Sequence, residues 1–201
     1  ERVVLYTNPV PHLHSRHGYF PGIAVWPCGE LLALFVMGEA FESVNSTTVV
    51  SRSTDGGKSW VLLGPIAGAP PRGACPASDY LKPTVLKDGR LLAMGYRFHR
   101  RDPELAIGNP ATNGVLPGDV IASFSEDRGT TWSTPAVVPP FFPELVEVSG
   151  PCLQLRNGDL LAGGALFKRW DGSQPSGQKG VLLRSRDGGR KVGRASCRER
   201  V

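Results

Sequence analysis

Several polar side chains in this sequence are of types that do chemistry when loops bring them together. Glu42 offers a carboxyl group, which can serve as a general acid or base in cleaving a glycosidic bond. Arginine can hold a carboxylate through two parallel hydrogen bonds, and the ring of Trp170 can stack on a sugar. The further candidates for substrate binding are Arg16, Arg97, Arg100, Asp79 and Lys82. Carboxylates, cations and an aromatic ring together suit an acidic or polyhydroxylated sugar.

His17 and Tyr19 form a second candidate pair. They lie next to the first expected strand, and they can act as base and acid on a uronate in a lyase reaction. His17 also forms a cluster with His12 and His14 that resembles a set of metal ligands. The cluster lies in a proline-bounded loop, and no further residue at a suitable spacing completes a metal site. We therefore expect no metal and no other cofactor. The competing interpretation of the charged residues is that most are simply solvated, since exposed loops are charged by default.

The elements that must position these residues are marked by a repeated turn sequence, Ser-x-Asp-x-Gly-x-(Ser/Thr)-Trp. Its positions are Ser53, Asp55, Gly57 and Trp60, then Ser125, Asp127, Gly129 and Trp132, and finally Ser185, Asp187 and Gly189. The Asp carboxylate can accept backbone N–H bonds, the Gly suits a positive φ, and the Trp pins the hairpin. The third copy has Val192 where Trp is expected. We expect a structural role for the motif, not a catalytic one.

A second repeated unit precedes each turn motif. It consists of an apolar run, a turn that ends at Gly29, Gly89 or Gly158, and another apolar run, repeating at roughly 60–70 residues. Four antiparallel strands at that period describe propeller blades, here about residues 19–66, 81–138 and 149–192. The apolar character of the first two strands predicts burial on both faces.

The turn motif resembles the Asp-box, or bacterial neuraminidase repeat, of the sialidase superfamily, whose members fold as six-bladed β-propellers. The resemblance implies an all-β, sialidase-like β-propeller fragment with about three of six four-stranded blades. It also implies an exo-acting glycoside hydrolase that acts on a glycan, in a secreted or periplasmic protein. The alternatives are a propeller without sialidase activity that binds glycans, or a polysaccharide lyase.

Two positions of the family can be compared with this chain. Sialidases carry an Arg-Ile-Pro motif at the first inner strand, and here Tyr19 stands in place of the Arg, before Phe20 and Pro21. The acid/base Asp of the family lies in the loop after the second strand. Residues 38–46 contain no Asp there, only Glu39 and Glu42, so Glu42 is the candidate acid/base.

Blade topology sorts the loops into two faces. The first and third turns of each blade, including the Ser-x-Asp-x-Gly turns, lie on one face of the disc. The second loops and the connections between blades lie on the other face, and these longer loops carry the candidate residues named above. Because function is concentrated on such loops, we expect the site at that second face.

Composition limits the other classes of function. The 201 residues contain no apolar run of the ~20 residues that a membrane helix needs, and no signal peptide is visible after Glu1. Residues 193–201 read like a translated sequencing adapter and not a genuine basic tail, so we leave them out of the fold prediction. Setting aside their three Arg and one Glu lowers the formal net charge from +5 to +3, too small to indicate nucleic acid.

Overall fold

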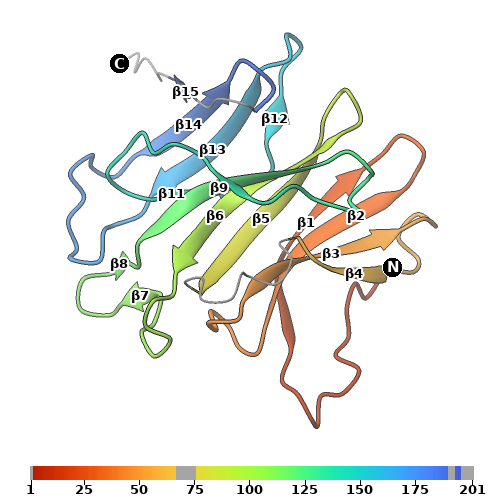
Figure 1. Cartoon of the computed structure of the whole chain (residues 1–201), viewed down its shortest axis with the longest axis horizontal. Coiled ribbons are helices and arrows are strands. Elements are labelled where there is room, and N and C mark those ends of the chain that lie inside the picture. The colour runs from red at the N-terminus through yellow and green to blue at the C-terminus, as the bar shows by residue number, and fades with distance from the viewer. Residues whose placement is uncertain (1, 67–75, 190–192, 196–201) are drawn as a thin grey trace.

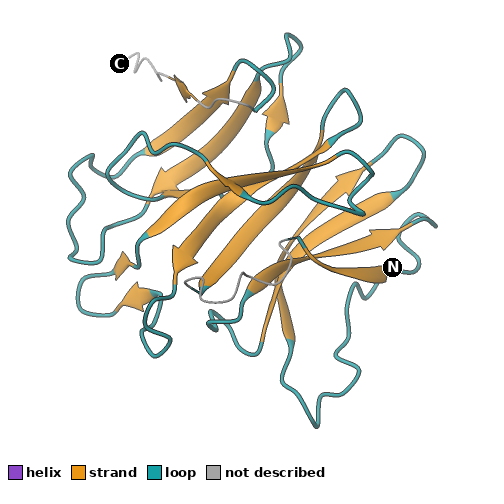
Figure 2. Cartoon of the chain, in the orientation of Figure 1, coloured by secondary structure: helices purple, strands orange, loops and turns teal. Residues whose placement is uncertain are grey.

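The computed structural model describes residues 2–66, 76–189 and 193–195. The described chain is built from β-strands, turns and loops, and contains no helix (Figure 2). Three antiparallel sheets stand side by side, with the second sheet between the first and the third (Figure 1). Each sheet is built from one continuous segment of the chain, interrupted in the second sheet only by the short hairpin described below, as the period of the sequence predicts.

The first sheet has the order β1-β2-β3-β4 and the second has the order β5-β6-β9-β10. The strands of these two sheets are β1 His17–Val25, β2 Leu31–Gly38, β3 Thr47–Ser53, β4 Val61–Pro65, β5 Ala77–Val85, β6 Leu91–His99, β9 Gly118–Ser125 and β10 Ala136–Val137. A separate short hairpin, β7 Gly108–Asn109 and β8 Gly114–Val115, lies within the loop between β6 and β9.

The third sheet has the order β11-β13-β14-β15, and its inner strand is divided because β12 also pairs with β13. Its strands are β11 Val146–Glu147, β12 Leu153–Gln154, β13 Leu160–Leu166, β14 Gly180–Ser185 and β15 Gly193–Ala195. Residues 193–195, at the start of the segment left out of the fold prediction, pair with β14 as β15 and extend the sheet. Val192 and residues 196–201 lie outside the described residues, so the adapter interpretation itself stays a prediction.

The core lies between the faces of neighbouring sheets. Leu32 and Leu34 of the first sheet pack with Leu81, Leu91 and Ile121 of the second. A second cluster joins the second and third sheets. Strand β2 is almost wholly buried, as expected, whereas β1 is largely exposed, which corrects the expectation of burial on both faces. Apolar character shows that a strand can be buried, but burial also needs a second sheet on its other side.

The Ser-x-Asp-x-Gly turns close through their own side chains. Ser53 Oγ donates to Asp55 Oδ1 at 2.7 Å and accepts the Gly57 N–H at 2.8 Å. Asp55 accepts the Ser59 N–H at 3.0 Å, and Trp60 Nε1 donates to the Gly57 carbonyl at 3.0 Å. The second copy repeats these bonds, and the third keeps those made by its serine. All three glycines of the motif have a positive φ, as the sequence predicts.

The second turn also packs onto the neighbouring sheet. A Cβ atom added at Gly129 would collide with the side chain of Leu32, so the motif uses its glycine for close approach as well as for φ. Glu30, in the turn between β1 and β2, pairs with Arg52 at 2.7 Å and with Arg128 of the second turn motif at 3.2 Å. The turns thus hold adjacent sheets together at one face of the molecule.

Candidate functional site

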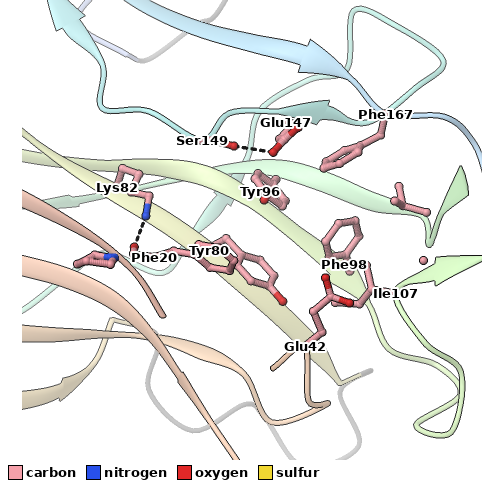
Figure 3. A pocket seen from close by; sticks show the side chains of 13 residues that line it. Phe20, Glu42, Tyr80, Lys82, Tyr96, Phe98, Ile107, Glu147, Ser149 and Phe167 are labelled. Atoms are coloured by element: carbon pink, nitrogen blue, oxygen red, sulfur yellow. Dashed lines mark hydrogen bonds between the residues drawn. The ribbon is translucent and has the colours of Figure 1, made fainter. Parts of the chain in front are cut away.

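A cavity of about 580 Å³ opens at the face opposite to the Ser-x-Asp-x-Gly turns. Side chains from all three sheets converge on it (Figure 3). Its lining consists of Phe20, Pro21, Glu42, Tyr80, Lys82, Tyr96, Phe98, Ile107, Gly108, Val115, Glu147, Ser149 and Phe167. The topology predicted a site at the loops between second and third strands, and Glu42, Ile107 and Gly108 lie in two such loops. Most of the aromatic lining was not predicted.

The aromatic wall is produced by strand alternation on β5 and β6. Tyr80 is directly opposite Tyr96 in the sheet, and their rings stack with centroids 5.3 Å apart and planes at 18°. Phe98, two residues further along β6, meets Tyr96 edge to face at 5.5 Å. Phe167 of the third sheet completes the wall, with its ring 5.6 Å from that of Tyr96. The wall therefore joins residues that lie far apart in the sequence.

Backbone in the left-handed region lines the same cavity. Phe20 has φ 52° and Glu42 has φ 59°, and both are cavity residues. The register of β1 shifts between Tyr19 and Gly22, so Phe20 lies in a β-bulge. Lys82 Nζ donates to the Phe20 carbonyl and lies 5.9 Å from the centroid of its ring. Unfavourable backbone of this kind is concentrated at functional sites, where the surrounding structure maintains it.

The charged groups of the cavity are two carboxylates and one ammonium. Glu42 and Glu147 both extend into the space, and Ser149 Oγ donates to Glu147 Oε1 at 2.9 Å (Figure 3). Burial lowers the pKa of Lys82. Burial, followed by the charge of Glu147, raises the pKa of Tyr96 to about 12, and burial with the charge of Glu42 raises the pKa of Tyr80. Both tyrosines therefore stay protonated and can donate hydrogen bonds.

Arg97 and Asp79 were predicted to bind substrate, but the structure places both on the opposite side of their strands. Arg97 lies between Tyr96 and Phe98 in β6, so alternation directs it away from the cavity, and it pairs with Asp119 at 2.9 Å. Asp79 precedes Tyr80 in β5, and its carboxylate accepts the Thr48 N–H at 2.6 Å. Arg97 therefore forms an ion pair within its own sheet, and Asp79 forms a hydrogen bond to the neighbouring sheet.

Three more of the candidate residues lie outside the lining. Arg16 lines a separate hollow of about 300 Å³ with Glu39. The Trp170 carbonyl accepts bonds from Asn109 and Thr112, at 3.0 and 2.9 Å, so its backbone anchors the loop that carries β7 and β8. Arg100 is only 3% exposed, and within the described chain its Nε and Nη1 atoms have no hydrogen-bond partner.

The proposed lyase pair also lies beside the cavity and not in it. His17 is exposed, and its Nε2 atom forms a hydrogen bond with Ser15 Oγ at 2.9 Å. Tyr19 packs its ring edge-on against Phe41 at 5.4 Å. Of the predicted site residues, the cavity brings together Glu42 and Lys82 only. The missed aromatic residues had one visible signal, the Tyr96-Arg97-Phe98 alternation, which is typical of a strand with one covered face.

The described residues contain no group of three or more His, Cys, Asp and Glu side chains that could hold a metal ion. They also contain no helix with the length and apolar character needed to cross a membrane.

Comparison with known proteins identifies the fold. No protein-family model matches the chain, and no curated protein matches it. Solved structures do match. A protein of unknown function from Dyadobacter fermentans is 22% identical, with a TM-score of 0.67 over 96% of this chain and 56% of that one. The Hadza microbial sialidase Hz136 is 21% identical, with a TM-score of 0.61 over 87% of this chain and 36% of the sialidase.

A third match is the Penicillium chrysogenum alpha-L-arabinanase in complex with arabinobiose. It is 21% identical, with a TM-score of 0.57, and the alignment covers 88% of this chain and 48% of the arabinanase. The chain thus spans about half or less of the length of these structures. At this identity the likeness shows the fold, which is an all-β, sialidase-like β-propeller fold shared with enzymes that act on glycans.

Proposed function

We propose that this chain supplies part of the active site of a sialidase-like, exo-acting glycoside hydrolase. Its substrate is a glycan whose terminal sugar is acidic or polyhydroxylated. The observation that carries the proposal is the cavity, which joins stacked aromatic rings to carboxyl groups at the loop face of a fold shared with glycan-active enzymes. Aromatic rings pack against the C–H faces of sugars, and carboxyl pairs provide the acid and base of glycoside hydrolysis.

Glu42 is the proposed general acid or base. It lies in the loop between β2 and β3, it lines the cavity, and its left-handed φ indicates that the surrounding structure fixes its position. Glu147 is the second carboxyl group of the cavity and is oriented by Ser149. The lyase alternative is less well supported, because His17 and Tyr19 do not line the cavity.

We further propose that each sheet is one blade of a six-bladed propeller and that the Ser-x-Asp-x-Gly turns are its Asp-boxes. The sheets span residues 17–65, 77–137 and 146–195, close to the blades expected at 19–66, 81–138 and 149–192. The hydrogen bonds within the three turns support the motif assignment. A secreted or periplasmic location follows from the same resemblance, and export of the full-length protein fused to a reporter tests it.

Turnover by the full-length protein tests the proposed activity. Fluorogenic sialosides, arabinofuranosides and neutral hexosides should reveal at least one substrate. The Glu42→Gln variant should then lose about 10²–10⁴-fold in kcat, because it removes the group that transfers the proton. Glu39→Gln, a matched change in the same loop outside this cavity, should keep the activity of the parent protein. Full activity in Glu42→Gln would refute its role, and binding without turnover of any glycoside would refute the hydrolase.

A further inference from the structure

The charges that line the cavity carry information about the sugar it accepts. Among the described residues that line the cavity, Glu42 and Glu147 are acidic and Lys82 is basic. Arg16 and Arg97, which could have held an acidic sugar, lie elsewhere, and Arg97 is already paired with Asp119. The buried Arg100 is near enough to influence Tyr80 but is absent from the cavity lining.

The ammonium group of Lys82 is already engaged by the protein. It donates to the Phe20 carbonyl, which lies in the β-bulge of β1, and it lies beside the Phe20 ring. Lys82 thus holds Phe20, one of the aromatic faces of the cavity, in its left-handed conformation. This bond uses one of the three N–H donors of the ammonium, so a substrate carboxylate that drew Lys82 toward the sugar would compete with the Phe20 carbonyl and weaken the support of the bulge.

The remaining polar groups suit hydroxyl groups. The hydroxyl groups of Tyr80 and Tyr96 are kept protonated by burial and by the nearby carboxylates, so they are donors. In the described structure the Tyr80 hydroxyl is buried and lacks a hydrogen-bond partner, which leaves it free to donate to a ligand. The two glutamates accept hydrogen bonds from sugar hydroxyls. An anionic sugar would instead meet two like charges in a partly enclosed space.

We propose that the side of the cavity built by this chain favours an uncharged, polyhydroxylated terminal sugar over a carboxylated one. This inference rests on the proposed function for the site but narrows its substrate class, and it makes Lys82 a positioning residue for Phe20. The discrimination is electrostatic, so it should weaken as salt screens the charges.

Paired ligands that differ in a single group test the proposal on the full-length protein. Calorimetric titration would compare the methyl glycosides of galactose and glucose with the corresponding uronides, at low and at high salt. The neutral member of at least one pair should bind about tenfold more tightly at low salt, and high salt should reduce this ratio. Equal or tighter binding of the uronides, or binding of none of the four, would overturn the proposal.

A variant that removes one negative charge from the cavity tests the electrostatic argument directly. Glu147→Gln should raise the affinity for the uronide and narrow the ratio, whereas Glu126→Gln, at the opposite face in the second turn motif, should leave the ratio unchanged. An unchanged ratio in Glu147→Gln would contradict the electrostatic argument. Selective binding of the neutral sugar without turnover would refute the proposed hydrolase activity but support this inference. Preferred turnover of a sialoside or uronide would support the hydrolase activity but refute this inference.

Discussion

At the scale of single residues, the hydrogen bonds of a carboxylate decide whether it stabilises a turn or stays open to a ligand. The carboxylate of Asp127 is closed within its own turn, where it accepts from the Thr131 hydroxyl at 2.6 Å and the Thr131 N–H at 2.8 Å. These bonds lower the pKa of Asp127 to about 2. Glu42 instead extends into an open cavity. The aspartates of the turns are therefore structural, whereas Glu42 is available for a substrate.

The depressed pKa of Asp127 predicts how stability depends on pH. A carboxyl group with a lowered folded-state pKa stabilises the protein above its unfolded pKa of about 3.9, and this contribution disappears as the pH falls through about 2. Asp127→Asn should therefore be less stable than the parent protein at pH 5, and the difference should shrink toward pH 2. Chemical denaturation across this range measures it, with Glu126→Gln as the control. A difference that is constant with pH would contradict the prediction.

At the scale of elements, threonine hydroxyl groups link neighbouring sheets. Thr48 of β3 donates to the Asp79 carbonyl at 3.2 Å and accepts the Leu81 N–H at 3.0 Å, both in β5. Thr84 of β5 links its sheet to the third sheet in the same way, because its hydroxyl oxygen accepts the Cys152 N–H at 2.8 Å. These bonds fix how one sheet sits against the next. They therefore position β5, which carries Tyr80 and Lys82 into the cavity.

Replacing Thr48 tests this linkage. Thr48→Val keeps the shape of the side chain but leaves the Leu81 N–H without its partner in a fully buried place, which should cost about 1–3 kcal/mol in the free energy of unfolding. Thr47→Val is the matched control, because Thr47 is only partly buried and its single bond to Asp79 is long, at 3.4 Å. Denaturant unfolding compares the two, and equal losses would show that the link contributes nothing specific.

At the scale of the whole molecule, the three sheets form an open array (Figure 1). Strand β4 is the outer strand of the first sheet, and it exposes Val61 at 63% together with Leu62 and Leu63 at 44% each. Ile23 and Val25 of β1 are exposed as well. Unpaired apolar edges of this kind promote pairing with other chains, so we expect the 201-residue chain by itself to associate.

Charge on the outer strand should suppress that association. Val61→Lys with Leu63→Lys places two like charges on the exposed edge and removes little buried surface, so the monomeric fraction should rise while the fold is kept. Thr54→Lys with Ala111→Lys adds the same charge at exposed turn and loop positions outside β4. Size-exclusion chromatography with light scattering distinguishes edge pairing from a general effect of charge. An equal rise of the monomeric fraction in both variants would argue against pairing through the β4 edge.

The sequence by itself determined the features that depend on neighbours along the chain. The Ser-x-Asp-x-Gly turns close through side chains within a few residues of each other, and the apolar runs on either side of Gly29 and Gly89 define hairpins whose strands pair locally. The all-β class and the number of sheets follow from their repetition. The face that carries the cavity followed as well, because strand order alone assigns each loop to one face.

Only the tertiary structure decided which side chains meet in the cavity. A shift of one residue in a strand exchanges its two faces, so the alternation alone did not decide whether the face with Tyr96 and Lys82 or the face with Arg97 and Asp79 would meet the cavity. The bulge that presents Phe20, and the exposure of β1, likewise depend on what packs against that strand. The physical reason is that hydrogen bonds in turns are local, whereas burial requires a partner surface that arrives from distant parts of the chain.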